Sequence, residues 1–510
     1  MEPLNLYKIF RDRFESNFDQ PFLTLADGSH FSFRQVDHMS ARFSTALAEL
    51  GVKIADRVVV QVDKSPAAVA LYLACLRIGA VYVPLNTAYT GAEVAYFLND
   101  AAAALFVCRP ETTERLSSVA KEAGVPLTLS LGTSEDGSLA DRARQSLPTL
   151  ELARRKPDDI VAMLYTSGTT GRSKGAMLTL ENLASNAMTL HDIWGFRPGD
   201  VLLHALPIFH VHGLFVALHC AMLNASSVIF LPGFDVNQVN SMLPGATVMM
   251  GVPTFYTRLL GCADFNRRQC QHMRLFISGS APLTKQTFEA FEQRTGHRIL
   301  ERYGMTETGM ITSNPLDGKR IAGTVGFALP GVDIRVADKT GNPVPPGTVG
   351  TVELKGPNVF SGYWQMPDKT AGEFRDDGFF MTGDLGQLAA DGRLTLVGRS
   401  GDLIISGGYN IYPKEIEAVI DQVPGVLESA VIGIPDHDFG ESVMALVVTS
   451  EHNPASEDSI LAITRSQLAR FKQPRKIVLV GELPRNAMGK VQKNILRKQY
   501  ASSCRRSSLP

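Results

Sequence analysis

Short runs of β-branched residues alternate with amphipathic stretches along the first part of the chain. Residues 57–62 have the pattern of a buried strand, residues 66–78 that of a helix, and residues 81–84 that of a second strand. Repetition of strand, helix and strand predicts parallel sheets with helices on both faces. The same strand pattern returns at residues 160–165, 228–231, 248–252 and 275–278.

The pattern changes after about residue 325. Residues 342–347 form a turn cluster, and residues 351–354 and 394–397 alternate like antiparallel strands. A compact α+β segment follows, with Pro413 near the start of an expected helix. We therefore expect an N-terminal domain at residues 1–398, a boundary segment at residues 399–402 and a C-terminal domain at residues 403–510.

Length, composition and charge indicate the class of protein. The chain has 510 residues, so more than one domain is expected. Hydrophobic residues make up 45% and charged residues 20%, as in an ordinary globular protein. With 50 basic and 51 acidic residues, net charge is −1, which gives no indication of a nucleic-acid or membrane partner. Small-molecule substrates fit this balance better.

The six cysteines have no CxxC spacing, which argues against a zinc site or a disulfide framework. No secretory signal or membrane-spanning run is visible, and residues 505–510 form a polar tail without a peroxisomal tripeptide. These features favour a cytoplasmic location.

The strongest local signal is the segment 165–175, which follows the expected strand at residues 160–164 and reads YTSGTTGRSKG. Its backbone N–H groups and hydroxyls can turn toward phosphate oxygens, and Lys174 adds a charge. It is not a Walker A loop, because Lys174 is followed by glycine. A flexible surface linker is the alternative, but a linker has no need for this composition directly after a buried strand. We interpret the segment as a phosphate-binding loop.

Three further motifs are weak when taken one at a time. Glu307, within residues 303–308, could hold Mg²⁺ beside a phosphate loop or be a solvated surface acid. Asp384 and Arg399 could bind a ribose, or lie in ordinary turns. Lys490, within residues 484–490, could lie on a basic solvated face.

Together and in this order, the four motifs resemble the adenylate-forming superfamily of acyl-CoA synthetases, nonribosomal adenylation domains and beetle luciferases. The resemblance covers nearly the whole chain. It implies an α/β fold: a large N-terminal domain of doubly wound sheets with a small β-barrel-like subdomain, and a mobile α+β C-terminal domain. It also implies an AMP-forming acid–thiol ligase activity, with Mg²⁺ as cofactor and with ATP and coenzyme A as co-substrates.

The resemblance assigns roles to particular residues. Lys490, Thr306 and Glu307 would be catalytic, with Glu307 at Mg²⁺, and Ser406, Gly407, Gly408 and Tyr409 would bind CoA. The ATP site would comprise Thr166, Ser167, Gly168, Thr169, Thr170, Gly171, Lys174, Ser280, Ala281, Pro282, Tyr303, Gly304, Met305, Thr306, Asp384, Arg399 and Lys490.

The chemistry explains the charges. The acid attacks the α-phosphate and makes an acyl-adenylate, so two anions must meet and Lys490 offsets the developing charge. CoA thiol then attacks the adenylate. In this family the C-terminal domain rotates between the two steps, and this rotation withdraws the lysine. Acetylation of Lys490 by a lysine acetylase would remove the charge of its side chain, and a deacetylase would restore it. The family usually has Asp or Lys at the pivot, and here it is Gly401.

The acid is indicated by two arginines. Thr254 and Arg258 are spaced i,i+4 and share a face if their segment is helical, and Arg302 precedes the Tyr303 motif. Buried cations need partners, so two arginines at an acyl pocket predict a second carboxylate on the substrate. The segments 251–258, 302–308 and 321–326 look like those of malonyl-CoA synthetases. The alternatives are a surface ion pair for Arg258 and a pairing of Arg302 with Glu301 or another acid.

The substrate pocket is thus expected to contain His210, Arg258, Ser280 and Arg302. A metal pair formed by His210 and His212 on a strand is disfavoured, because no third ligand stands beside them. Other activities to be separated from malonate–CoA ligation are activation of methylmalonate, fatty or aryl acids, loading of a carrier protein, and nucleotide sensing without turnover.

Overall fold

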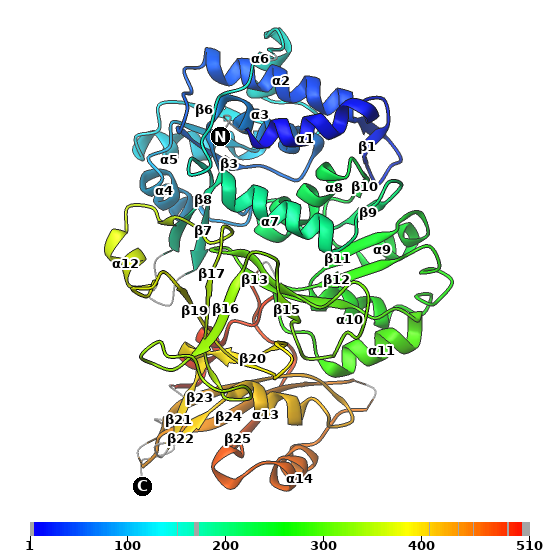
Figure 1. Ribbon diagram of the computed structural model, residues 1–510, viewed down its shortest axis with the longest axis vertical. Coiled ribbons are helices and arrows are strands. Elements are labelled where there is room, and N and C mark those ends of the chain that lie inside the picture. The colour runs from blue at the N-terminus through cyan, green and yellow to red at the C-terminus, as the bar shows by residue number, and fades with distance from the viewer. Residues whose placement is uncertain are drawn as a thin grey trace.

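The computed structural model describes residues 5–149, 151–167, 173–406, 409–436, 438–451, 453–486 and 489–501. Four sheets organise this part of the chain, and Figure 1 shows them arranged from the N-terminal half to the C-terminal segment along the long axis. The fold is mixed α/β, with a large N-terminal domain and a smaller C-terminal domain.

The first sheet has the order β18-β8-β7-β4-β3-β5-β6. Its inner strands are parallel, and the hairpin β7–β8 is antiparallel. Its strands are β3 (Arg57–Gln61), β4 (Val81–Pro84), β5 (Leu105–Cys108), β6 (Thr128–Ser130), β7 (Ile160–Ser167), β8 (Ser173–Thr179) and β18 (Gly362–Tyr363).

The second sheet has the order β15-β14-β13-β12-β11-β9-β10-β1-β2, and its central strands are also parallel. Its strands are β1 (Pro21–Thr24), β2 (His30–Ser32), β9 (Val201–His204), β10 (Ser227–Phe230), β11 (Val248–Gly251), β12 (Leu275–Ser278), β13 (Leu300–Met305), β14 (Gly309–Ser313) and β15 (Phe327–Ala328).

Helices cover both faces of these sheets, as predicted. Val58 and Val60 of β3 join the central core with the helix α3, whereas Val59 points to the opposite face, against α4 and α5. The period of two along a strand is the reason for this division. The helix α3 is buried at every position from Pro66 to Arg77, and this explains its apolar sequence.

The helices of the N-terminal part are α1 (Leu6–Phe14), α2 (Phe33–Glu49), α3 (Pro66–Ile78), α4 (Gly91–Asp100), α5 (Thr113–Glu122), α6 (Ser138–Gln145), α7 (Leu180–Ile193), α8 (His219–Leu223), α9 (Val236–Met242), α10 (Pro253–Gly261), α11 (Lys285–Thr295) and α12 (Pro367–Ala371). A π-helix, η3 (His212–Leu218), precedes α8.

A third, antiparallel sheet lies between the two ends of the molecule (Figure 1). It contains β16 (Asp333–Ala337), β17 (Gly350–Lys355), β19 (Phe380–Leu388) and β20 (Leu394–Arg399), so the alternating strands expected there are confirmed. A 3₁₀ turn, η5 (Ser400–Asp402), follows β20 directly.

The C-terminal segment is a sheet with helices. It contains β21 (Ile404–Ser406), β22 (Tyr409–Ile411), β23 (Val426–Asp436), β24 (Gly440–Thr449) and β25 (Lys476–Val480), with α13 (Pro413–Ile420), α14 (Glu457–Gln467) and α15 (Lys493–Ala501). Its two hydrophobic clusters contain only residues from Ile404 onward. The predicted limits at residues 399–402 stay a prediction.

Candidate active site

A buried carboxylate stands at the centre of the candidate site. Glu307 follows β13 and is 5% exposed. Its Oε1 accepts hydrogen bonds from the Thr166 hydroxyl (3.3 Å) and from the Tyr363 hydroxyl (2.9 Å). Three segments far apart in sequence, the end of β7, the turn after β13 and the strand β18, therefore meet at one carboxylate.

Lys174 lies beside this carboxylate and belongs to a strand. It faces Thr166 directly in the antiparallel pair β7–β8. Its Nζ lies 4.0 Å from the centre of the Tyr363 ring and 3.8 Å from Oε1 of Glu373. Burial lowers the pKa of Lys174, and Glu373 opposes that shift. The two ends of the segment predicted as one long loop, residues 165–167 and 173–175, thus belong to the paired strands β7 and β8. The predicted residues Gly168, Thr169, Thr170 and Gly171 lie outside the described residues.

A second acidic site lies on the antiparallel sheet. Asp384 on β19 and Arg399 on β20 are direct partners in the ladder, and their side chains pair at 3.1 Å. The Tyr303 hydroxyl donates to Oδ2 of Asp384 at 2.6 Å. The structure thus brings together these three predicted ATP-site residues, and Tyr303 contacts Asp384, the carboxylate that is expected to bind the ribose.

Lys490 reaches this same region from the C-terminal segment. A Cβ added to Gly489 would lie 3.1 Å from Oγ1 of Thr254, so the two segments are in contact. The Lys490 N–H donates to Oδ1 of Asn486 at 3.0 Å, which fixes the turn. Burial, together with the charge of Arg399, lowers the pKa of Lys490 to about 8. The lysine is therefore held near the charged residues of β19 and β20.

Arg302 occupies the other face of β13. Adjacent strand residues point to opposite faces, so Arg302 turns away from the Tyr303 side. It is 2% exposed, and its guanidinium lies against Gly279: a Cβ there would be 2.4 Å from Cζ. Among the described residues its Nε and Nη2 have no hydrogen-bond partner. Burial lowers the pKa of Arg302 to about 9.

The predicted alternative partner of Arg302 does not neutralise it. Glu301 points to the opposite face and accepts a hydrogen bond from the Leu283 N–H at 3.2 Å. Burial raises the pKa of Glu301 to about 7, against the opposing charge of Lys414. Arg298 is also occupied elsewhere, because it pairs with Glu292 at 2.6 Å on the surface. Arg302 is thus a buried cation without a protein carboxylate in the described part of the chain.

Two histidines line the region around Arg302. Burial and the Arg302 charge lower the pKa of His210 to about 4, so its ring is neutral near pH 7. His212 begins the π-helix η3, and its Nδ1 lies 3.2 Å from the Ser280 hydroxyl. Ser280 has a left-handed backbone, with φ of 69°. The two histidines do not share a strand, contrary to the premise of the metal-pair alternative.

Arg258 takes a different position from Arg302. The helix α10 (Pro253–Gly261) does place Thr254 and Arg258 one turn apart, as the spacing predicts. Arg258 is exposed, however, whereas Thr254 is half-buried under Gly489. The structure gives the buried position to Arg302 alone, and the role of Arg258 in binding acid stays a prediction.

The predicted CoA-binding residues lie on the C-terminal sheet. Ser406 ends β21 and is buried, while Tyr409 is 57% exposed and stacks on Phe471 with ring centres 4.6 Å apart. Gly407 and Gly408 lie outside the described residues. The Tyr409 ring thus has an aromatic neighbour that the sequence motifs do not reveal.

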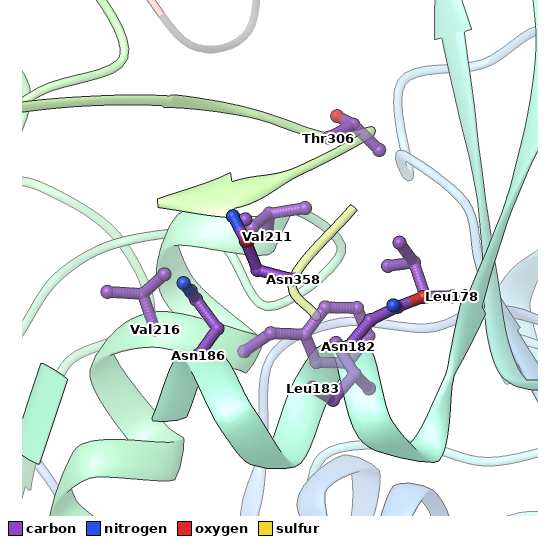
Figure 2. A pocket seen from close by; sticks show the side chains of 10 residues that line it. Leu178, Asn182, Leu183, Asn186, Val211, Val216, Thr306 and Asn358 are labelled. Carbon is purple, nitrogen blue, oxygen red and sulfur yellow. The ribbon is translucent and has the colours of Figure 1, made fainter. Parts of the chain in front are cut away.

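Behind Thr306 lies a small cavity, seen in Figure 2 between α7 and the turn after β13. Its volume of about 10 Å³ suits one water molecule and excludes a substrate. Two asparagines beside it fix the backbone of the turn: Asn186 donates to Met310 O at 2.9 Å, and Asn358 donates to Thr308 O at 2.8 Å. These bonds fix the backbone that directly follows the predicted residues Gly304, Met305 and Thr306.

Sequence reasoning missed Tyr363, Glu373 and the two asparagines. Tyr363 belongs to a strand of only two residues, which has no detectable period. No group of three His, Cys, Asp or Glu side chains that could hold a metal occurs among the described residues. In the same part of the chain, no helix is long and apolar enough to cross a membrane.

Comparison with known proteins agrees with this geometry. The model of the AMP-binding enzyme family matches residues 10–364, and the AMP-binding enzyme C-terminal domain matches residues 415–490. The mitochondrial malonate–CoA ligase ACSF3 of Mus musculus is 36% identical, over 94% of this chain and 88% of that protein. The chain therefore belongs to the AMP-binding enzyme family.

Solved structures agree in the whole architecture. ATP-bound MatB from Rhodopseudomonas palustris is 50% identical and covers 98% of this chain and 100% of its own, with a TM-score of 0.94. The apo form of MatB from the same organism, 49% identical over 99% of this chain and 100% of its own, has a TM-score of 0.85. Within its family, the protein is an AMP-forming CoA ligase, which uses ATP and CoA as substrates.

Proposed function

We propose that this ligase acts on malonate. In the first step a malonate carboxylate attacks the α-phosphate of ATP, which forms malonyl-adenylate and releases pyrophosphate. In the second step the CoA thiol attacks the acyl carbon, which gives malonyl-CoA and releases AMP. The observation that carries the proposal is Arg302, 2% exposed and without a carboxylate partner among the described residues.

The physical argument is one of charge. A guanidinium in a buried site loses hydration, and a carboxylate that accepts two parallel hydrogen bonds compensates this loss. Malonate has a second carboxylate, which remains free while the first one reacts. A monocarboxylic acid would leave Arg302 unpaired. The names of the relatives support the same acid, because the mouse protein is a malonate–CoA ligase.

We assign the remaining charges to ATP. Lys174 and Thr166 flank the segment that would hold the β- and γ-phosphates, and Asp384 with Arg399 would bind the ribose. Ser280, with its neighbours Ala281 and Pro282, would border the adenine. Lys490, whose loop contacts Thr254 through Gly489, would bridge the carboxylate and the α-phosphate.

Glu307 fits a magnesium site. Mg²⁺ is usually held by one or two carboxylates together with substrate phosphates, not by a full protein cage. Glu307 offers one buried carboxylate whose Oε1 already accepts hydrogen bonds from Thr166 and Tyr363. Bound there, Mg²⁺ would neutralise triphosphate oxygens. The chain's own contribution is to hold this carboxylate and the Lys174 ammonium in fixed positions.

Two further assignments belong to this proposal. We place the enzyme in the cytoplasm, because Cys75, Cys108, Cys220, Cys262 and Cys270 are all free thiols. We also propose that a lysine acetylase could silence the enzyme at Lys490, whose ammonium is required for adenylation.

The decisive experiment measures pyrophosphate release with a panel of small mono- and dicarboxylates at fixed ATP and CoA. We expect kcat/KM for malonate to exceed that for acetate, propionate and butyrate by a large factor. Equal values for malonate and butyrate would contradict the choice of acid and leave the ligase activity standing.

A further inference from the structure

Tyr363 is held rigidly between the two charged groups of the phosphate side. It forms β18 with Gly362 and pairs with Ala176 on β8, and the next residue, Trp364, donates to Gly175 O at 2.8 Å. The Tyr363 side chain is 4% exposed. Its backbone is thus fixed to the same strand that holds Lys174, so ring and ammonium share one frame.

The ring of Tyr363 contacts Lys174. The ammonium lies 4.0 Å from the ring centre, within the range in which the negative face of an aromatic ring attracts a cation. Other partners of this ammonium are weaker in geometry, since Glu373 is at 3.8 Å and itself pairs with Lys369 at 2.7 Å. The ring therefore fixes the place of the Lys174 charge while leaving its N–H donors available.

The hydroxyl of Tyr363 contacts the carboxylate. It donates to Oε1 of Glu307 at 2.9 Å, and the Thr166 hydroxyl donates to the same oxygen at 3.3 Å. Among the side-chain hydrogen bonds of the described residues, both that Glu307 accepts end on Oε1. The Oε2 atom is the oxygen that this arrangement leaves for a ligand.

We propose that Tyr363 is a positioning residue that places both charges of the triphosphate site, Lys174 through its ring and the metal-binding carboxylate of Glu307 through its hydroxyl. The proposal rests on the assignment of Lys174 and Glu307 to ATP and its metal, and it is independent of the acid. Hydrogen bonds to a ligating carboxylate orient it, and their loss typically weakens metal binding roughly 10- to 100-fold.

Calorimetric titration of ATP, with Mg²⁺ and with EDTA, separates the two contacts. Tyr363→Phe keeps the ring and loses the hydroxyl. We expect the affinity of this variant for metal-free ATP to stay within about twofold of the wild type. The Mg²⁺ concentration that gives half of the Mg²⁺-dependent increase in ATP affinity should rise roughly tenfold or more. Trifluorophenylalanine at the same position keeps the shape but cancels the negative ring face. Metal-free ATP should then bind roughly 3- to 30-fold more weakly than in Tyr363→Phe.

The matched control is Tyr7→Phe. The Tyr7 hydroxyl also donates to a buried carboxylate, that of Asp37, but it lies on α1 in the distant part of the N-terminal domain (Figure 1). It should alter the melting temperature and neither ATP titration. If Tyr363→Phe needs no more Mg²⁺ than the wild type, the hydroxyl does not position Glu307. If fluorination leaves metal-free binding unchanged, the ring does not hold Lys174. If the wild type binds ATP equally with Mg²⁺ and EDTA, the assignment of the metal to Glu307 itself fails.

Discussion

Gly489 lies directly against Thr254, with 3.1 Å between the position of a Cβ on Gly489 and Oγ1 of Thr254. The first residue precedes Lys490 in the C-terminal segment, and the second lies in the first turn of α10 (Pro253–Gly261). This contact brings the lysine to the Asp384–Arg399 pair. The higher TM-score to the ATP-bound form of MatB than to its apo form agrees with this arrangement. We propose that this arrangement is the one that serves the first half-reaction, in which Lys490 would meet the α-phosphate.

Lys490→Ala should abolish adenylation selectively. The ammonium offsets charge that develops as two anions meet, and removal of such a group typically costs at least ~10²-fold in rate. Conversion of supplied malonyl-adenylate with CoA should remain close to wild type. Lys493→Ala is the control, because Lys493 is a neighbouring lysine that pairs with Glu417 at 2.5 Å. An equal loss in both half-reactions of Lys490→Ala would rule out this selective role.

The pH dependence of adenylation should show the state of Lys490. Its pKa is lowered to about 8, so the ammonium is charged below that pH and neutral above it. Since the charged form is the active one, kcat/KM should fall about tenfold per unit as pH rises above the pKa. In Lys490→Arg the guanidinium stays charged, and this alkaline decline should disappear from whatever activity remains. A decline that persists in Lys490→Arg would assign the titration to another group.

Arg302→Ala should depress kcat/KM for malonate sharply. Loss of one partner of a buried charge pair typically costs about 2–5 kcal/mol, or roughly 30- to several-thousand-fold. Activity on acetate, propionate or butyrate should hold or rise, because these acids lack the second charge. Arg298→Ala is the control and should change little, since Arg298 pairs with Glu292 on the surface.

Arg258→Ala tests the second predicted arginine with the same acids. We expect a malonate-specific loss here too if Arg258 turns inward when substrate binds, although its side chain is exposed in this structure. A loss common to all acids in both Arg258→Ala and Arg302→Ala would assign the arginines to structure and leave the acid unknown.

Gly279→Ala should weaken malonate recognition through Arg302. The added Cβ would lie 2.4 Å from Cζ of Arg302, so the guanidinium must move. A displacement of about 1 Å can cost ~10²-fold in rate, and we expect that order of loss in kcat/KM for malonate. The KM for ATP should change little. Gly261→Ala is the matched control, because a Cβ there meets no atom within 4 Å. Equal losses for malonate and acetate would show a general distortion.

Gly401→Pro should separate the two half-reactions if residues 399–402 are the hinge. Gly401 lies in the single 3₁₀ turn Ser400–Asp402 that joins β20 to the C-terminal segment. Proline fixes φ near −65° and removes an N–H, so rotation at this turn should be hindered. One half-reaction should fall much further than the other in rapid-quench measurements. Near-normal rates in both would move the pivot elsewhere.

Much of the regular fold follows from the sequence. The helix Pro66–Ile78 and the strand Leu275–Ser278 have the predicted bounds, because each is a nearly continuous apolar run that is buried along its length. The hairpin that pairs Thr166 with Lys174 was not foreseen, since glycine, serine and threonine suggested a loop. Tyr363 could not be found, because its two-residue strand gains its position from tertiary contacts, with β8 and with the Thr370 hydroxyl.

The candidate site was predictable where several motifs, taken together, indicate the chemistry. Asp384, Arg399 and Tyr303 meet as the resemblance implies, because the ladder places the first two opposite each other. The difference between Arg258 and Arg302 could not be read from charge. It depends on which arginine belongs to a buried strand and which to the exposed face of a helix.

The two faces of β13 carry different side chains, and this has a consequence for how the substrate specificity of such an enzyme can change. Arg302 and Tyr303 are joined by one peptide bond, yet Arg302 lies against Gly279 and Tyr303 contacts Asp384. We assign the first face to the acid and the second to the nucleotide. A side chain on the Arg302 face can be substituted without contact with the groups assigned to ATP. Specificity for the acid can therefore change while adenylation is preserved. Insertion of a single residue into β13 would instead turn each of these side chains to the opposite face of the strand, and both binding functions would be lost.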